Sequence, residues 1–181
     1  MAGRNPEKCA CVREQIGARP DTPILVADAT DPESLKSMAA RGNVVVSAVG
    51  PYQLYGSSLV AACAETGTDY VDLCGEPAWM RSMIDAHESV SKQTGARIVF
   101  SCGFDSIPFV LGVWFLQQEA IARFGRTLPR VKCRIRESKG SLSGGTLASL
   151  KATMAAVVRD PSVLSLLMNP FSLTPWVHRA A

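Results

Sequence analysis

The stretch VVVSAVGPYQLYG, from Val44 to Gly56, decides the fold. Its opening run carries no charged residue and is mostly β-branched, which is typical of a central strand in a parallel sheet covered on both faces. The strand ends at Gly50-Pro51-Tyr52, where a residue without a side chain precedes a proline whose φ is fixed. Such a turn leaves room for a flat ligand beside the backbone, but a Gly-Pro pair is also common in plain tight turns. Both interpretations stay open at this point.

Strand and helix patterns alternate on both sides of this stretch. Strands are predicted at residues 24–27, 44–49, 70–73 and 97–101, and helices at 31–42, 57–66, 77–94, 108–124 and from 144 to about 158. The helix ends follow from capping signals: Asp31 precedes Pro32 at one start, and Gly67 and Gly95 are natural stops. Regular alternation of this kind predicts an α/β fold with a Rossmann-like, mostly parallel sheet.

The pattern changes after residue 101. Residues 108–124 predict a long, largely apolar helix, residues 130–136 alternate like a half-exposed strand, and the closing NPFSLTPW is interrupted by prolines. We therefore place a domain boundary near Leu128. Residues 1–128 are expected to form the Rossmann-like domain, and residues 129–181 the beginning of a second, α+β domain that is incomplete here.

Composition excludes several classes of function. The chain has 181 residues, 47% hydrophobic and 19% charged, with a net charge of +3 and a pI near 8.6. Lys and Arg are scattered, so nothing indicates a nucleic-acid partner. There is no apolar run of the roughly 18 residues that a membrane span needs, and the N-terminal MAGRNPEK does not resemble a signal peptide. We expect a cytoplasmic location, with peripheral membrane association left open.

Cysteine and histidine spacing argues against a disulfide framework or a metal site. The six cysteines are Cys9, Cys11, Cys63, Cys74, Cys102 and Cys133. Only Cys9 and Cys11 are close together, and His87 and His178 have no partner at ligand spacing. Reduced thiols without a bound metal are therefore expected.

Candidate site residues lie where the predicted strands end, because open α/β sheets bind ligands beyond the carboxyl ends of their strands. These positions are Asp28, the turn at 47–52, Cys74-Gly75-Glu76 and the segment CGFDSIP at 102–108. The chain contains neither G-x-G-x-x-G nor G-x-x-x-x-G-K-[ST]. The residues alone therefore predict a nucleotide-binding-like domain without its phosphate loop.

Two carboxylates are candidates for the catalytic group, which the sequence leaves unassigned. Glu76 could act as a general acid if partly buried, or simply begin the helix at Pro77. Asp105 and Ser106 could cap the helix that follows, or belong to an anion site at its N-terminus. We favour a buried strand-end thiol over a nucleophile for Cys102, since no paired base is evident.

Two further features have a structural and a functional interpretation. The stretch from Ser143 to Thr146 is expected to cap the next helix in preference to binding an anion. Trp79, Trp114 and Phe115 lie in apolar helical settings and are expected in a core or an interface.

Three segments carry a resemblance to a known family. VGPYQLYG, GTDYVDLCGEP and GARIVFSCGFDSIP resemble the saccharopine dehydrogenase-like oxidoreductases, in particular the branch of mycobacterial trans-acting enoyl reductases. The similarity runs from Ala2 to about Pro175 and includes AGRNPEK, SGGTLASL and NPFSLTP.

The resemblance implies an NADP(H) cofactor and a set of residues that contact it. Arg4 would meet the 2′-phosphate, Asp28 would lie beside the adenine, and the turn at 48–52 would line the path to the nicotinamide ribose. The cofactor-binding residues implied are Arg4, Asp28, Ala48, Val49, Gly50, Pro51, Tyr52, Cys102, Gly103 and Phe104. The alternatives are that Arg4 is a solvated terminal residue and Asp28 a turn former.

The chain departs from the family pattern in two places. Family members have a strand and a G-x-x-G-x-[TS]-G phosphate loop before the AGR segment, so we expect that this chain lacks the first βα unit. Phe109-Val110 stand where the family often has Ser-Asp, which removes a carboxylate from the mouth of the expected cleft.

The resemblance also implies a function. The leading expectation is an NADP-dependent oxidoreductase of lipid or glycolipid metabolism that reduces lipid or polyketide-derived acyl chains on a carrier, with a homodimer left open and activity of this fragment in doubt. The competing expectation is a non-catalytic, membrane- or lipid-associated interaction protein that retains the fold. A fragment that does not fold stably is the third, since an absent strand exposes unpaired backbone.

Overall fold

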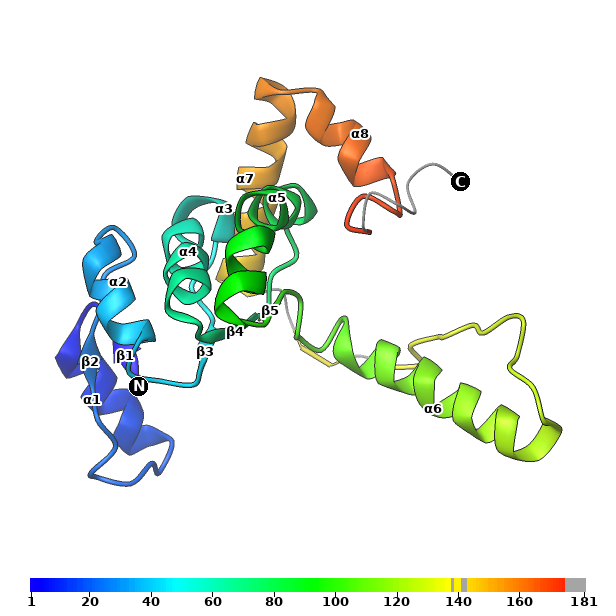
Figure 1. Cartoon of the computed structure of the whole chain (residues 1–181), viewed down its shortest axis with the longest axis horizontal. Coiled ribbons are helices and arrows are strands. Elements are labelled where there is room, and N and C mark those ends of the chain that lie inside the picture. Colours follow the sequence, from blue (N-terminus) through cyan, green and yellow to red (C-terminus); the bar gives the residue numbers. More distant parts are fainter. Residues whose placement is uncertain (138, 141–142, 175–181) are drawn as a thin grey trace.

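A computed structural model describes residues 1–137, 139–140 and 143–174, and shows short parallel strands surrounded by helices (Figure 1). Strand β1 (Ala2–Gly3) pairs with β2 (Leu25–Val26) in one sheet. A second sheet has the order β3 (Val44–Ser47), β4 (Asp69–Asp72), β5 (Ile98–Val99). Every one of these pairings is parallel. The predicted α/β class is confirmed, and the four predicted strands lie where expected: three are shorter by two or three residues, and β4 has the predicted length but begins one residue earlier.

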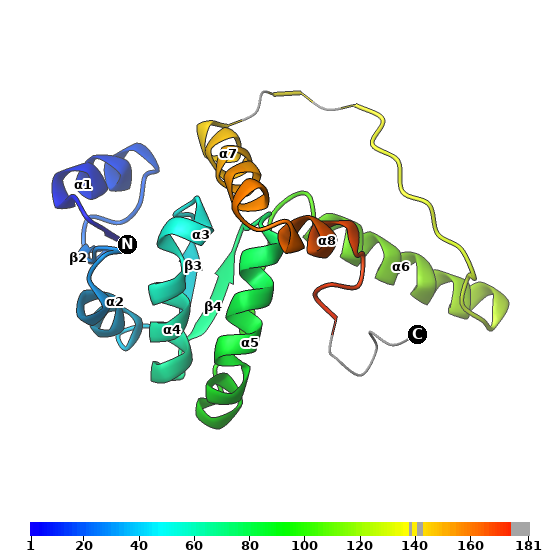
Figure 2. The ribbon, with the colours of Figure 1, turned by 90° about the horizontal axis from the view of Figure 1, so that it is seen from above.

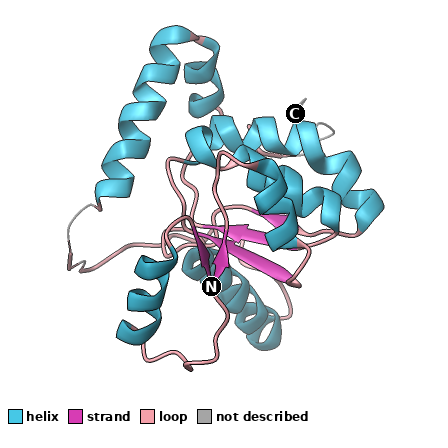
Figure 3. Ribbon diagram, turned by 90° about the vertical axis from the view of Figure 1, so that its left-hand side faces the viewer, coloured by secondary structure: helices cyan, strands magenta, loops and turns pink. Residues whose placement is uncertain are grey.

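Helices connect and cover the strands (Figure 3). They are α1 (Pro6–Gln15), α2 (Pro32–Ala39), α3 (Tyr52–Tyr55), α4 (Ser57–Thr66), α5 (Pro77–Thr94), α6 (Ile107–Phe124), α7 (Gly144–Arg159) and α8 (Ser162–Met168). The capping predictions at Asp31, Gly67 and Gly95 are confirmed, whereas α2 ends at Ala39 and not at residue 42 as predicted. The Asp31 carboxylate accepts from the backbone N–H groups of α2, and Gly67 and Gly95 end α4 and α5 with φ of 73° and 83°.

The predicted strand at residues 130–136 is wrong. The segment has no ladder partner in the part of the chain that the structure describes, and nearly all of it is exposed. Alternation of apolar and charged residues defines a face for a strand but cannot supply the neighbouring strand that makes it one. Past Phe124 the described residues contain α7 and α8 and no strand, so the α+β character of a second domain stays a prediction.

The core lies between the second sheet and the helices α2, α4 and α5, which pack in sequence against one another (Figure 2). Val60 and Cys63 of α4 and Tyr70 of β4 are fully buried. Trp79 of α5 packs edge-on against Phe100, with 5.4 Å between ring centroids. Trp79 is thus a core residue, as predicted from its apolar helical setting.

Helix α6 differs from the other helices because its apolar side chains are uncovered. It projects away from the sheets (Figure 1), and only Ala120 along it is buried. Trp114 and Phe115 are 61% and 58% exposed, which leaves an interface as the remaining interpretation for them. Within the described residues, no helix is both long and apolar enough to cross a membrane.

All six cysteines have free thiols, in very different surroundings. Cys11 and Cys133 are exposed, whereas Cys63 and Cys74 are buried. Burial raises the pKa of the Cys63 thiol and of the Cys74 thiol to about 12 each.

Thiol reactivity should follow this division. At pH 8 a maleimide reagent is expected to modify Cys11 and Cys133 within minutes and to leave Cys63 and Cys74 unmodified, because the buried thiols are neither accessible nor ionised. Peptide mass spectrometry after quenching reads out each site. Labelling in denaturant is the control, where all six should react; equal native rates for Cys63 and Cys133 would contradict the packing of α4.

Candidate functional site

Parallel pairing brings the candidate residues to the carboxyl ends of neighbouring strands, as predicted. The register pairs Gly3 with Val26 in one sheet and Ser47 with Asp72 in the other. Arg4 and Asp28 follow the ends of β1 and β2, and the turn at 48–52 follows β3. The segments at 73–76 and 102–104 follow β4 and β5.

Arg4 and Asp28 form the first part of the site. Arg4 is exposed, and Asp28 is half-buried. The Asp28 carboxylate accepts hydrogen bonds from the backbone N–H of Thr30 at 2.9 Å and from its hydroxyl at 2.7 Å. These bonds hold the pKa of Asp28 below its ordinary value, and the positive charge of Arg4 adds a smaller effect in the same direction. Asp28 is therefore a turn former, and its role beside an adenine stays a prediction.

The turn after β3 has an exposed half and a buried half. Ala48, Val49 and Gly50 are exposed, whereas Pro51 and Tyr52 are buried, and the Gly50–Pro51 peptide is cis. A Cβ at Gly50 would lie 3.5 Å or more from its neighbours, so the backbone there is open. A flat ligand can lie against this exposed half.

Tyr52 faces inward from the same turn. Its hydroxyl donates to the Ser47 carbonyl oxygen at 3.1 Å and accepts from the Leu73 N–H at 3.3 Å, so the ring links the ends of β3 and β4. Burial raises the pKa of Tyr52 above its ordinary value. The cofactor contact that the resemblance implies for Tyr52 stays a prediction.

The second glycine of the deciding stretch, Gly56, has a packing role. A Cβ there would come within 2.7 Å of Cζ2 of Trp79 and 2.8 Å of the Tyr52 carbonyl oxygen. The indole is fixed from its other side, since its N–H donates to the Ser57 hydroxyl at 3.0 Å. The close approach at Gly56 is therefore that of a core side chain, while the open backbone lies at Gly50.

Asp72 was not singled out by sequence, yet its carboxylate accepts three hydrogen bonds at this edge. It is fully buried. Its Oδ1 accepts from the N–H groups of Cys74 at 3.0 Å and Ser101 at 2.8 Å, and its Oδ2 from the Tyr70 hydroxyl at 2.9 Å. It thereby holds together the segments that follow β4 and β5. The signal available in the sequence was its place at the carboxyl end of the DYVD strand.

Glu76 is also buried, 2% exposed, although it occupies the N-cap position of α5. Its carboxylate does not cap that helix but reaches back to α3. Oε1 accepts from the Tyr52 N–H at 2.9 Å and the Ser149 hydroxyl at 2.8 Å. Oε2 accepts from the N–H of Gln53 at 3.0 Å and from its side-chain amide at 2.9 Å. Both oxygens thus have protein donors.

The segment after β5 carries the other candidates. Asp105 and Phe104 are exposed, the latter 73%, and Phe104 lies edge-on to Phe109. Ser106 is the N-cap residue of α6 but makes no side-chain capping bond. Cys102 was expected to be buried and is half-buried instead, with its Sγ 3.6 Å from the Val99 carbonyl oxygen. Strand β5 ends at Val99, so this thiol lies three residues past the end of the strand.

The capping prediction at Ser143 is confirmed, because its hydroxyl accepts from the Thr146 N–H at 3.1 Å. Helix α7 that follows brings Ser149 next to Glu76 and the turn after β3. The site therefore joins the turn at 48–53, Glu76 and α7, while Arg4 and Asp28 stand at the end of the other sheet. The described residues contain no group of three or more side chains suited to a metal ion.

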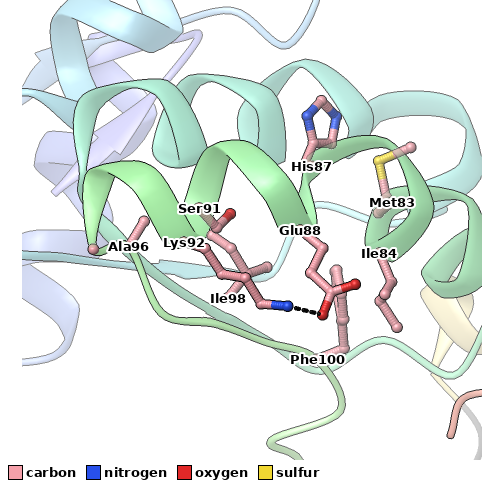
Figure 4. A pocket seen from close by; sticks show the side chains of 10 residues that line it. Met83, Ile84, His87, Glu88, Ser91, Lys92, Ala96, Ile98 and Phe100 are labelled. Carbon is pink, nitrogen blue, oxygen red and sulfur yellow. Dashed lines mark hydrogen bonds and ion pairs between the residues drawn. The ribbon is translucent and has the colours of Figure 1, made fainter. Parts of the chain in front are cut away.

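A separate hollow of about 400 Å³ lies between α5 and β5 (Figure 4). Met83 and Ile84 of α5 and Phe100 after β5 give it an apolar lining. The ion pair of Glu88 and Lys92, 2.7 Å long, lies on its helical side. None of the predicted site residues lines it, so this hollow is distinct from the candidate site.

Comparison with known proteins agrees with the fold. Residues 1–99 match the family described as saccharopine dehydrogenase NADP binding domain. Over 176 residues the chain is 46% identical to Rv2449c of Mycobacterium tuberculosis, named provisionally as a trans-acting enoyl reductase, covering 97% of this chain and 42% of that protein. It is 43% identical to the trans-acting enoyl reductase of Mycobacterium leprae, over 96% of this chain and 42% of the relative. The chain thus spans about two fifths of the length of these curated relatives.

A solved structure supports the fold alone. The apo histidine-tagged saccharopine dehydrogenase (L-Glu forming) of Saccharomyces cerevisiae superimposes with a TM-score of 0.51 at 19% identity. The match covers 68% of this chain and 25% of the yeast protein.

Proposed function

The chain belongs to the saccharopine dehydrogenase family through its NADP-binding domain, and we propose that it forms the cofactor-binding part of an NADP-dependent enoyl reductase. The proposed substrate is an acyl chain of lipid or polyketide origin, held on a carrier. The trans-acting enoyl reductase names of the relatives support the reaction class.

One observation carries the proposal most directly. Two parallel strands that are hydrogen-bonded neighbours, β1 and β2, end in an exposed guanidinium and a carboxylate, Arg4 and Asp28. In a Rossmann-like sheet this is where the adenosine half of a dinucleotide lies, and a guanidinium fork suits a 2′-phosphate. The exposed backbone of Ala48, Val49 and Gly50 offers a flat surface toward the nicotinamide half.

The described residues fit the two ends of the cofactor better than its middle. Arg4 supplies a cation for the phosphate, and the open backbone at Gly50 supplies room for a ring. The printed sequence has no glycine-rich loop for the pyrophosphate. The fit therefore rests on the adenosine phosphate and on the turn after β3.

Unpaired strand edges support an addition to this proposal. Among the described residues β1 pairs only with β2, and β3 only with β4, so each has one edge without a ladder partner. Val44 and Val46 of β3 are 53% and 71% exposed, although their apolar character is typical of a central strand. We infer that a further parallel strand pairs with these edges, followed by the loop that holds the pyrophosphate.

Within this proposal the protein's own residues bind, orient and donate protons. NADPH supplies hydride to the double bond when bound. Arg4 holds the adenosine end, and the turn at 48–50 supports the ring. The exposed carboxylate of Asp105, just before α6, is the candidate that would pass a proton from solvent to the substrate. Glu76 stays a second candidate, although both its oxygens already accept hydrogen bonds.

Replacing Arg4 with alanine tests the cofactor assignment. Calorimetric titration of the chain, alone and extended upstream by a strand and a glycine-rich loop, is expected to show NADPH binding that is stronger in the extended form. Arg4→Ala should weaken NADPH binding about 10- to 100-fold and leave NADH binding unchanged, because only NADPH carries the 2′-phosphate.

Arg19→Ala is the matched control, since it removes the same charge from an exposed side chain and should change neither affinity. Equal losses for NADPH and NADH in Arg4→Ala would contradict the assignment of Arg4. Failure of both forms of the chain to bind NADPH would overturn the cofactor proposal itself.

A second candidate function is favoured by α6. Its exposed apolar residues, Trp114 and Phe115 among them, support a non-catalytic protein that associates with lipid surfaces. Flotation with phosphatidylcholine vesicles, together with no NADPH binding by either form, would favour this candidate over the reductase.

A further inference from the structure

The Glu76 carboxylate connects three segments that are distant in sequence. It accepts from the first two N–H groups of α3, which lie 24 and 23 residues before it, and from the Ser149 hydroxyl of α7, 73 residues after it. The residue is 2% exposed. A buried carboxylate with donors on both oxygens has little freedom to move.

The α3 side of this cluster determines where the turn after β3 lies. Pro51 precedes α3 and provides no side-chain capping bond, so the N–H groups of Tyr52 and Gln53 depend on Glu76. These N–H groups would otherwise be buried without a partner. Tyr52 is linked in turn to the end of β3 by its hydroxyl, 3.1 Å from the Ser47 carbonyl oxygen. The exposed backbone of residues 48–50 lies between these two attachments.

The α7 side approaches the same turn from the other direction. Ser149 and Thr153 lie one helical turn apart, and the Gln53 side-chain amide is 3.4 Å from the Thr153 hydroxyl. A Cβ on Gly50 would be 3.8 Å from the Ser149 hydroxyl. A void of about 20 Å³, the size of a single water, lies between Gln53, Glu76 and Thr153. Helix α7 therefore contacts the turn at 48–53 and Glu76 through the side chains of Ser149 and Thr153.

We propose that Glu76 is a positioning residue through which the docking of α7 sets the geometry of the turn at 48–53, and with it the affinity for NADPH. The part of this inference that concerns the affinity for NADPH rests on the proposed function. Glu76 touches neither hydride nor substrate in this role. It transmits the position of α7 to the backbone that lines the nicotinamide half of the site.

Hydrogen exchange, followed by NMR on the 181-residue chain, tests the link without cofactor. Ser149→Ala leaves both backbone bonds of Glu76 in place but removes its contact with α7. We expect exchange of the Tyr52 and Gln53 amides to rise about fivefold, roughly the effect of one hydrogen bond. In a Glu76→Ala background, Ser149→Ala should add almost nothing, because the connection is already broken.

A control variant and a reporter amide distinguish the positioning of the turn at 48–53 from a general loss of stability. Ser82→Ala is the matched control, since the Ser82 hydroxyl bonds only within its own helix, and it should leave both amides unchanged. The Val71 amide in β4 reports global opening and should keep its exchange rate in Ser149→Ala. If Glu76→Ala does not fold, Thr153→Ala and its pairing with Ser149→Ala still report on the α7 side.

NADPH titration completes the test. It uses whichever form binds NADPH more tightly, the 181-residue chain or the chain extended upstream. Ser149→Ala should weaken NADPH binding by a similar factor of about five. Unchanged amide exchange in Ser149→Ala, or equal and additive effects in both backgrounds, would overturn the inference. Absence of NADPH binding in the wild type would overturn the proposed function alone, because the exchange measurement still decides whether Glu76 connects α7 to the turn.

Discussion

Replacing Asp72 with alanine is expected to lower the free energy of unfolding by about 3 to 5 kcal/mol, because three buried donors lose their acceptor at once. These donors are the N–H groups of Cys74 and Ser101 and the Tyr70 hydroxyl. Ser101 adopts a φ of 59°, a conformation that non-glycine residues rarely take. Its N–H bond to Asp72 helps to hold it there. Urea unfolding followed by circular dichroism measures the change.

The loss is a large fraction of the roughly 5 to 15 kcal/mol that stabilises a typical domain, so a milder variant is needed beside it. Asp72→Asn keeps one acceptor oxygen for the two N–H groups and should lower the free energy of unfolding by about 1 to 2 kcal/mol. Asp21→Asn, at an exposed position, is the control and should leave the unfolding midpoint unchanged. A loss below about 1 kcal/mol in Asp72→Ala would mean that the carboxylate does not hold the strand ends together.

Gly56→Ala is the second substitution with a large expected effect. It should lower the free energy of unfolding by about 2 to 4 kcal/mol. The backbone at Gly56 has φ of −87° and ψ of −28°, which alanine adopts without strain. The cost is therefore steric, since the new methyl group would lie 2.7 Å from Trp79 and 2.8 Å from a backbone oxygen. Neither neighbour can move easily, because the indole is buried and hydrogen-bonded to Ser57.

Gly112→Ala on α6 is the matched substitution for this measurement. A Cβ at Gly112 meets nothing within 4 Å, and alanine is the better helix former by up to about 1 kcal/mol. Urea unfolding should thus show a lower free energy of unfolding for Gly56→Ala and a higher one for Gly112→Ala. A neutral Gly56→Ala would place Trp79 elsewhere than against the turn between α3 and α4.

Local signals predicted most of the fold. Ser57–Thr66 and Pro77–Thr94 were predicted with their observed ends because a left-handed glycine follows each. Helix α1 was missed although Asn5-Pro6 repeats the cap and proline of Asp31-Pro32. The strand at residues 130–136 was predicted wrongly, since pairing depends on a neighbour that alternation in sequence does not specify.

The candidate site was predictable in position but not in its internal connections. Parallel strands place Asp28 and the turn after β3 at their carboxyl ends by topology alone, whereas Arg4 became a candidate only through the resemblance. The bonds from Glu76 to Tyr52 and to Ser149 span 24 and 73 residues, and nothing local indicates them. The resemblance supplied the cofactor, whereas the roles of the individual contact residues stay predictions.

Helix α6 bears on how long the protein survives in a cell. Its apolar side chains stay uncovered along nearly its whole length, and exposed surface of this kind is what chaperones and proteases of the quality-control system act on. The cellular abundance of the protein then depends on the rate of degradation relative to the rate at which the apolar side chains of α6 become covered. A substitution far from any cofactor can therefore change the amount of protein present without changing what each molecule does.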